Sequence, residues 1–62
     1  MKVCKIVHGN KYYLQSCVSA FDPSTIKWTG IEENAKEFYP SEAVSYFQQL
    51  SYQFPNELFE VI

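Results

Sequence analysis

Hydrophobic and polar residues alternate over the first part of the chain, in two runs separated by a short polar segment. The runs cover residues 2–8 and 11–18 and are rich in β-branched and aromatic residues, which favour extended strands. Between them, Gly9-Asn10 suits a two-residue loop, because Gly in the first position fits a type II′ turn. The pattern therefore predicts an N-terminal β-hairpin with strands 2–8 and 11–18.

A turn at Gly9-Asn10 decides which residues share a face of this hairpin. In that register Ile6 faces Tyr13 and Cys4 faces Gln15, and cross-strand partners lie on the same face. The better core face is mostly aliphatic and holds Val3, Lys5, Val7, Tyr12, Leu14, Ser16 and Val18. The second face is mixed and holds Cys4, Ile6, His8, Lys11, Tyr13, Gln15 and Cys17. Because an exposed sheet face is normally polar, we expect other parts of the chain or another molecule to cover the second face.

A turn and a short strand follow the hairpin. The segment Phe21-Asp22-Pro23-Ser24 favours chain reversal. Residues 25–29 then alternate so that Ile26 and Trp28 share one side of a third strand. Residues 31–34 are expected to form a solvated connection, and residues 35–38 are compatible with either a short strand or a turn.

The helix is predicted at residues 40–50. Pro40 fits the first helical position, where a missing N–H costs nothing. An apolar stripe with helical spacing consists of Ala43, Phe47 and Leu50, with Val44 beside it and Tyr46 on its flank. Residues 51–56 are expected to form a loop, and residues 57–61 a last strand. Because the stripe is short, the helix should cover only part of one sheet face.

These elements define an α+β fold in which a small antiparallel sheet carries one helix on one face. The 62 residues are expected to form a single domain, 1–62. At about this length a chain buries only roughly 60 % of the surface that its unfolded form exposes. Self-association would therefore relieve the shortage of core.

Composition and spacing argue against catalysis. Cys4 and His8, the one histidine, lie four residues apart on a predicted strand, about 13 Å, which is too far for a shared zinc ion or a nucleophile pair. The adjacent carboxylates Glu32 and Glu33 are expected in an exposed connection, whereas acid–base catalysis needs a carboxyl group whose pKa burial has raised. With two glycines the chain has no Gly-rich phosphate loop. We therefore expect no enzyme, no metal and no cofactor.

The same composition bears on partners and location. A net charge of −2 with no arginine gives no electrostatic reason to bind nucleic acid, so a single-stranded nucleic-acid binder is the least favoured alternative. The sequence contains no apolar run long enough to span a membrane or to act as a signal peptide. These features predict a cytoplasmic protein with Cys4 and Cys17 reduced.

The aromatic residues give the strongest functional signal. The chain contains five tyrosines, five phenylalanines and one tryptophan, and Trp28, Phe38 and Phe47 are expected in the core. The remaining tyrosines are hard to place inside so small a domain, and tyrosine is enriched at protein interfaces. We therefore expect a protein-interaction surface made of Ile6, Tyr13, Gln15, Tyr39, Tyr46 and Tyr52. The alternative is a self-associating structural or oligomeric subunit, and a homodimer could use the second face or a strand edge.

One pattern in the second half of the chain resembles a known group of proteins. Trp28 ends a strand, Ala35 and Phe38 follow at a spacing of three, Pro40-Ser41-Glu42-Ala43 opens a helix, and residues 58–62 close the chain as a strand. This arrangement resembles small accessory proteins of phages and mobile elements with a ββ(β)αβ order. The resemblance implies a stand-alone inhibitor that binds and blocks a host protein, including components of antiviral defence such as CRISPR. It carries over no site residue.

Overall fold

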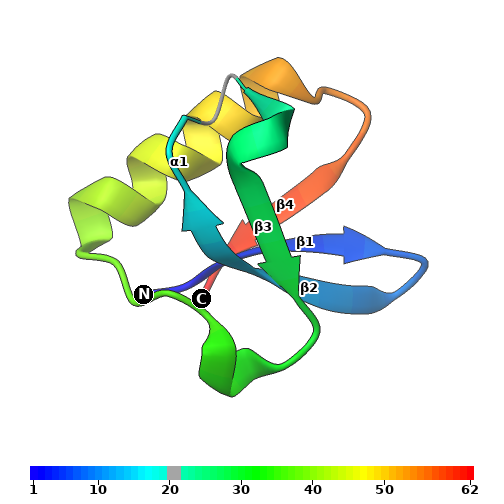
Figure 1. Ribbon diagram of the computed structural model, residues 1–62. Helices are drawn as coiled ribbons and strands as arrows, with labels where there is room; N and C mark the ends of the chain where they lie inside the picture. The colour runs from blue at the N-terminus through cyan, green and yellow to red at the C-terminus, as the bar shows by residue number, and fades with distance from the viewer. Residues whose placement is uncertain (20–21) are drawn as a thin grey trace.

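The computed structural model describes residues 1–19 and 22–62. Within these residues, four strands form one antiparallel sheet in the order β3-β2-β1-β4. The elements are β1 (Val3–Val7), β2 (Asn10–Cys17), the 3-10 turn η1 (Pro23–Thr25), β3 (Ile26–Thr29), the 3-10 turn η2 (Glu32–Asn34), α1 (Pro40–Gln53) and β4 (Leu58–Val61). Figure 1 shows α1 on one side of the sheet and η2 on the other. The predicted α+β class is confirmed, with strand ends within one residue of their expected positions.

The hairpin turn differs from the prediction. Val7 pairs with Asn10, so the loop is His8-Gly9 and not Gly9-Asn10. Both loop residues have positive φ, 51° at His8 and 80° at Gly9, as a type I′ turn requires. Such a turn matches the right-handed twist of the strands, which makes it a preferred hairpin connection. The whole predicted register is therefore displaced, and Cys4 faces Tyr13 where Gln15 was expected.

This displacement leaves most side chains on their predicted faces. The partner of each β1 residue moves by two positions along β2, and side chains on a strand alternate with a period of two. Val3, Lys5, Tyr12 and Leu14 therefore still share the face toward α1, called here the helix-side face. The second face still holds Cys4, Ile6, Lys11 and Tyr13.

A β-bulge overturns the predicted faces at the end of β2. Leu14 pairs with Trp28 but Ser16 pairs with Lys27, so Gln15 is the extra residue. Beyond the bulge Cys17 faces Ile26 and packs against the core on the helix-side face, whereas it was predicted on the same face as Cys4. Ser16 moves to the opposite side. The bulge thus places Cys4 and Cys17, both free thiols, on opposite faces of the sheet.

The core lies between the helix-side face and α1. Its buried residues come from both strands of the hairpin, from the segment before the helix and from α1: Val3, Leu14, Phe38, Ala43 and Leu50. Tyr46 was predicted on the flank of the helix, but it packs on this core with its ring centroid 5.1 Å from that of Phe38. Val44 was predicted beside the apolar stripe, yet it is exposed. The apolar stripe of α1 is therefore rotated toward Tyr46.

α1 is longer than predicted because no helix breaker occurs before Pro55. The Glu42 carboxylate accepts a hydrogen bond of 3.1 Å from the backbone N–H of Tyr39 at the start of the helix. At its other end the N–H of Phe54 donates to the carbonyl of Leu50 at 2.8 Å. Residues 51–53, expected in a loop, thus complete the last turn and bring Phe54 back toward the sheet.

The second face is covered partly by the chain itself. η2 crosses it, and the Tyr13 hydroxyl donates to Glu32 Oε1 at 3.2 Å. Beneath this cover Cys4 and Tyr13 are buried. Farther along the face Ile6 is only half-buried, and its strand neighbour Leu58 is 67 % exposed. The expectation that other parts of the chain cover this face is confirmed for its Cys4–Tyr13 end.

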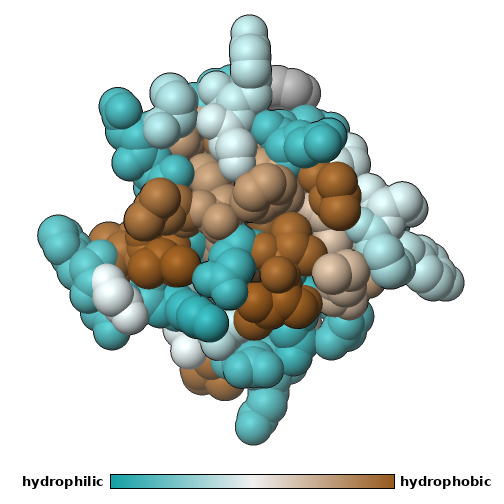
Figure 2. Space-filling model, turned by 180° about the vertical axis from the view of Figure 1, so that it is seen from behind, coloured by the Kyte–Doolittle hydropathy of each residue, from teal (hydrophilic) through white to brown (hydrophobic). Residues whose placement is uncertain are grey.

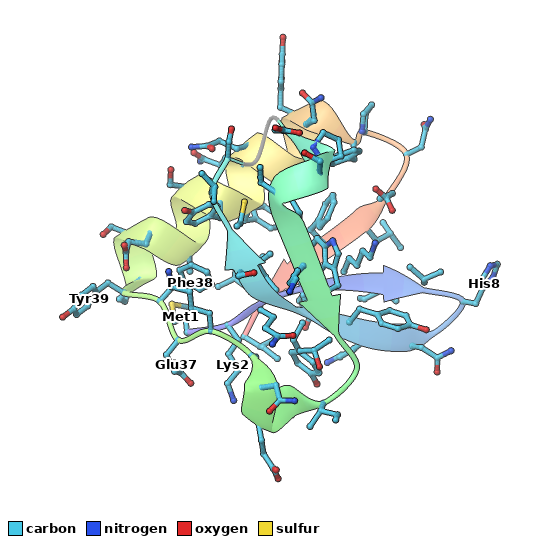
Figure 3. All side chains as sticks on the ribbon, viewed as in Figure 1. Met1, Lys2, His8, Glu37, Phe38 and Tyr39 are labelled. Carbon is cyan, nitrogen blue, oxygen red and sulfur yellow. The ribbon has the colours of Figure 1, made fainter. Side chains whose placement is uncertain are left out.

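The chain start is fixed to the segment before the helix. The Met1 ammonium lies 3.0 Å from Glu37 Oε2 and donates to the Phe38 carbonyl at 2.8 Å, and the Phe38 N–H donates back to Met1. Figure 3 shows Met1, Lys2, Glu37 and Phe38 close together, far from His8 at the hairpin tip. Residues 35–38 therefore form neither of the two predicted elements, because backbone pairing with Met1 and Leu14 holds them extended.

Candidate protein-binding surfaces

The six residues predicted from the sequence to form an interface do not meet on one surface. Ile6 and Tyr13 share the second face, and Gln15 is exposed at the bulge of β2. Tyr39 and Tyr52 lie near opposite ends of α1 and are 77 % and 82 % exposed. Tyr39 projects from the molecule in Figure 3, away from the Met1–Glu37 contact.

Two of these six residues have their aromatic rings engaged within the fold. Tyr13 is buried and bonded to Glu32, and Tyr46 packs on Phe38. Partial burial and the adjacent Glu32 carboxylate together raise the pKa of Tyr13. Both tyrosines thus have structural partners, which leaves Tyr39 and Tyr52 as the exposed tyrosines of the predicted set.

A different group of residues forms a pocket where α1 stops covering the helix-side face. The pocket has a volume of about 230 Å³. It lies between the start of β3, the end of α1 and the middle of β1, and is lined by Lys5, Pro23, Ile26, Trp28, Phe54 and Glu57. We call this group the aromatic pocket. An engineered cavity of about 150 Å³ holds benzene, whereas drug-sized ligands occupy roughly 300 Å³ or more. The aromatic pocket therefore has room for one side chain and not for a large cofactor.

Opposite charges meet over the rings of this pocket. The Lys5 ammonium lies 4.8 Å from the centroid of Trp28 and 4.0 Å from Glu57 Oε1. Behind them, Phe59 stacks on Trp28 with ring centroids 6.2 Å apart. Since the charges of Lys5 and Glu57 balance, the pocket offers an uncharged guest apolar walls and a rim that donates and accepts hydrogen bonds.

This pocket was not predicted from the sequence. Lys5 is the signal that could have indicated it, because the residue is charged on a mostly aliphatic face of the hairpin and its ammonium group needs solvent there. The other lining residues come from two more segments, residues 23–28 and 54–57, so the alternation pattern could not connect them.

A larger cavity of about 520 Å³ lies on the other flank of α1. It is lined mainly by polar residues, Ser19, Ser41, Glu42, Ser45 and Gln49, together with Val18 and Tyr46. Residues 20–21, next to its Val18–Ser19 wall, lie outside the described part of the chain, as does residue 21 of the predicted turn. This cavity is therefore assigned no ligand.

The thiols and carboxylates do not assemble a reactive centre in the described residues. Burial raises the pKa of the Cys4 thiol, with a smaller contribution from Glu60 that Lys11 opposes. Burial also raises the pKa of Cys17, against the opposing effects of Thr25 and Lys36. Thiols with a raised pKa are weak nucleophiles at neutral pH. Within residues 1–19 and 22–62 no three His, Cys, Asp or Glu side chains are grouped to hold a metal ion.

The outer edge of β4 is the second candidate surface. In Figure 1, β3 runs in front of the sheet and β4 lies toward the back. Figure 2 therefore faces the β4 side, and hydrophobic side chains gather near its centre among hydrophilic ones. Leu58, Ile62 and, from α1, Val44 are exposed apolar residues of this chain. Among the described strands β4 pairs only with β1, so its other edge is available for backbone pairing.

Comparison with protein-family models, curated proteins and solved structures finds no match for this chain. In the part of the chain that the structure describes, no helix has both the length and the apolar character needed to cross a membrane.

Proposed function

We propose that this protein is a non-enzymatic binding module that inserts one apolar side chain of a partner protein into the aromatic pocket. The observation that carries this proposal is the pocket of about 230 Å³, whose wall includes Trp28 and Phe54. Half-buried aromatic residues in a pocket of side-chain size have the character of binding hot spots. A protruding segment with an uncharged apolar or aromatic residue is the partner chemistry that this pocket suits.

Such binding would act by steric blocking. A domain of 62 residues that docks on a partner covers part of its surface without any chemical step. The resemblance to phage and mobile-element accessory proteins supports the idea of a host protein as the target, including a component of antiviral defence. A cytoplasmic location is part of the same proposal.

The test uses two substitutions, each of which removes one aromatic ring. Only one of the two substituted residues lines the aromatic pocket. Trp28 lines the pocket, whereas Phe38 is buried in the core outside it. The partner is first captured from host-cell extract, identified by mass spectrometry and purified. Its dissociation constant is then measured by titration calorimetry for the wild type, Trp28→Leu and Phe38→Leu.

We expect Trp28→Leu to weaken binding by about 30-fold or more, as loss of a hot-spot residue worth roughly 2 kcal/mol does. Phe38→Leu should bind like the wild type, and circular dichroism checks that both variants are folded. Equal binding by both variants would refute the pocket assignment. A catalytic turnover of the captured partner would refute the binding-module function itself.

A further inference from the structure

We propose that the free edge of β4 pairs with β4 of a second copy of this chain, so that two copies form one continuous sheet across a two-fold axis. This inference concerns a surface separate from the aromatic pocket and does not depend on it. Three observations carry it: the direction of the free backbone groups, the side chains that a symmetric register brings together, and the apolar flank of α1 beside this edge.

The backbone pattern of β4 is self-complementary. The Lys2 N–H donates to the Ile62 carbonyl at 2.7 Å, and the Ile62 N–H donates to Lys2 at 2.9 Å. Along an antiparallel ladder, hydrogen-bonded residue pairs alternate with pairs that are not hydrogen-bonded. Glu60 and Leu58 therefore also turn their backbone groups toward β1, while Phe59 and Val61 direct theirs outward. Two β4 strands satisfy these outward groups when Phe59 of each copy faces Val61 of the other.

This register also pairs the exposed apolar side chains. When Phe59 faces Val61 of the second copy, Leu58 faces Ile62 of the second copy, and the two-fold axis repeats that contact. Leu58 is 67 % exposed and Ile62 39 % exposed in the single chain. The dimer would thus bury four large aliphatic side chains on the second face, along the joined β4 edges.

The apolar surface continues onto the helix side of the same edge. The flank of α1 that carries Glu42, Ser45 and Gln49 lines the cavity beside Val18, near the end of β2. On a helical wheel, Val44 and Phe47 point to the opposite flank. α1 packs mainly over β4, so this apolar flank lies beside the β4 edge. In the dimer this flank faces the same flank of the second copy across the two-fold axis, on the helix side of the joined sheet.

The other edge of the sheet is less suited to pairing. β3 is as short as β4, but it carries the exposed Lys27, which has no ion pair within the described residues, and a lysine on an edge strand opposes the addition of another strand. β4 also carries a charge, Glu60, but Lys11 Nζ lies 3.9 Å from Glu60 Oε1 and offsets it. Across the two-fold axis Glu60 would face Glu60 of the second copy, which is the one unfavourable contact of this register.

The experiment is sedimentation equilibrium over a concentration series with four variants. Leu58→Lys and Ile62→Glu each place an unpaired charge in the proposed interface, and each should raise the dimer dissociation constant by about tenfold or more. The double variant Leu58→Lys/Ile62→Glu should recover most of this loss, because the new charges face each other only between copies. Within one chain positions 58 and 62 are four residues apart along the strand, about 13 Å. Val18→Lys, at an apolar position 87 % exposed elsewhere, is the matched control and should dimerise like the wild type.

One further variant, Glu60→Gln, tests the contact between the two Glu60 side chains at the two-fold axis. It removes the like-charge pair and should lower the dimer dissociation constant by up to about fivefold. Hydrogen exchange tests the register in the wild type without any substitution. The backbone amides of Phe59 and Val61 should exchange more slowly as the protein concentration rises. A wild type that remains monomeric at millimolar concentration would overturn the inference. A dimer that Val18→Lys weakens and Leu58→Lys does not would also overturn it. If the double variant does not recover dimerisation, the proposed register is wrong.

Discussion

On the helix-side face of the sheet, Val3 and Leu14 are completely buried together with Leu50 of α1, whereas the second face is closed by η2 and by charged side chains. Over the second face the Glu32 carboxylate accepts a hydrogen bond from the Tyr13 hydroxyl, and Lys2 Nζ lies 3.4 Å from Glu32 Oε2. A second ion pair joins Lys11 Nζ and Glu60 Oε1 at 3.9 Å. One face thus depends on buried apolar area, and the other on polar contacts at the surface around two buried side chains.

This difference predicts unequal contributions to stability. Burial of a whole aliphatic side chain contributes about 1.5–3 kcal/mol, and removing it also leaves a cavity. A surface ion pair contributes about 0–1 kcal/mol, and salt screens it. The helix-side face should therefore hold the fold together, while the second face can change its surface contacts at little cost. A face of this kind is able to adapt to a partner.

The largest effect is expected from Leu14→Ala. Leu14 is completely buried at the centre of the helix-side face, so its truncation should lower the free energy of unfolding by about 2–5 kcal/mol. Urea denaturation followed by circular dichroism measures the change. Leu58→Ala, at the exposed end of the second face, is the control and should change stability by no more than about 0.5 kcal/mol under monomeric conditions. Equal losses would contradict the contrast between the faces.

The next effect concerns the two cysteines, which lie on opposite faces. Cys4→Ser places a hydroxyl in a completely buried position of the second face, with an expected loss of about 1–3 kcal/mol. Cys17→Ser should cost less, because Cys17 is only half-buried. Thermal unfolding of both variants compares them. A larger loss for Cys17→Ser would contradict the greater importance of burial at Cys4.

A smaller effect is expected from Tyr13→Phe, which removes the hydrogen bond between η2 and the sheet. The hydroxyl donates to Glu32 Oε1 at 3.2 Å, and loss of such a bond costs about 1 kcal/mol. A double-mutant cycle with Glu32→Gln isolates the coupling between the two side chains. Additive losses would indicate that η2 is held to the second face by something other than this bond.

The smallest effect depends on pH and involves Glu37. The hydrogen bond from the Met1 ammonium, followed by its charge and that of Lys2, lowers the pKa of Glu37. A lowered folded-state pKa stabilises the fold above the unfolded-state pKa, near 4.5, and this contribution disappears as pH falls through the folded-state value. The difference in stability between the wild type and Glu37→Gln should therefore be largest near neutral pH and vanish in acid. Denaturation at several pH values tests this, and a constant difference would contradict it.

The sequence predicted the kinds of elements well, because each has a strong local signal. Two alternating runs joined by a turn predicted the hairpin. Pro40 and the apolar spacing of Ala43 and Leu50 predicted the helix. The turn was placed one residue too late. A register displaced by two leaves every side chain on its face, so the hydrophobic pattern has no means of detecting the error.

The bulge at Gln15 and the aromatic pocket were beyond the reach of the sequence for another reason. The prediction carried strict alternation to the end of β2, although Gln15 and Ser16 are adjacent polar residues between the apolar Leu14 and Cys17. In the structure both polar residues are exposed, and Cys17 packs on the core together with Ile26. The pocket needs three separate segments to converge, residues 5, 23–28 and 54–57. The interface residues inferred mainly from tyrosine content are dispersed over the molecule. Their role in binding stays a prediction.

The pairing of Lys2 with Ile62 places the two ends of the chain at the same rung of the ladder between β1 and β4. A force applied to both ends would then load the inter-strand hydrogen bonds one after another, as a zipper opens, and would not shear several of them at once. The first rungs to part would uncover Val3 and Val61, which belong to or pack against the core. The protein should therefore have low mechanical resistance along this direction, whatever its stability toward heat or urea.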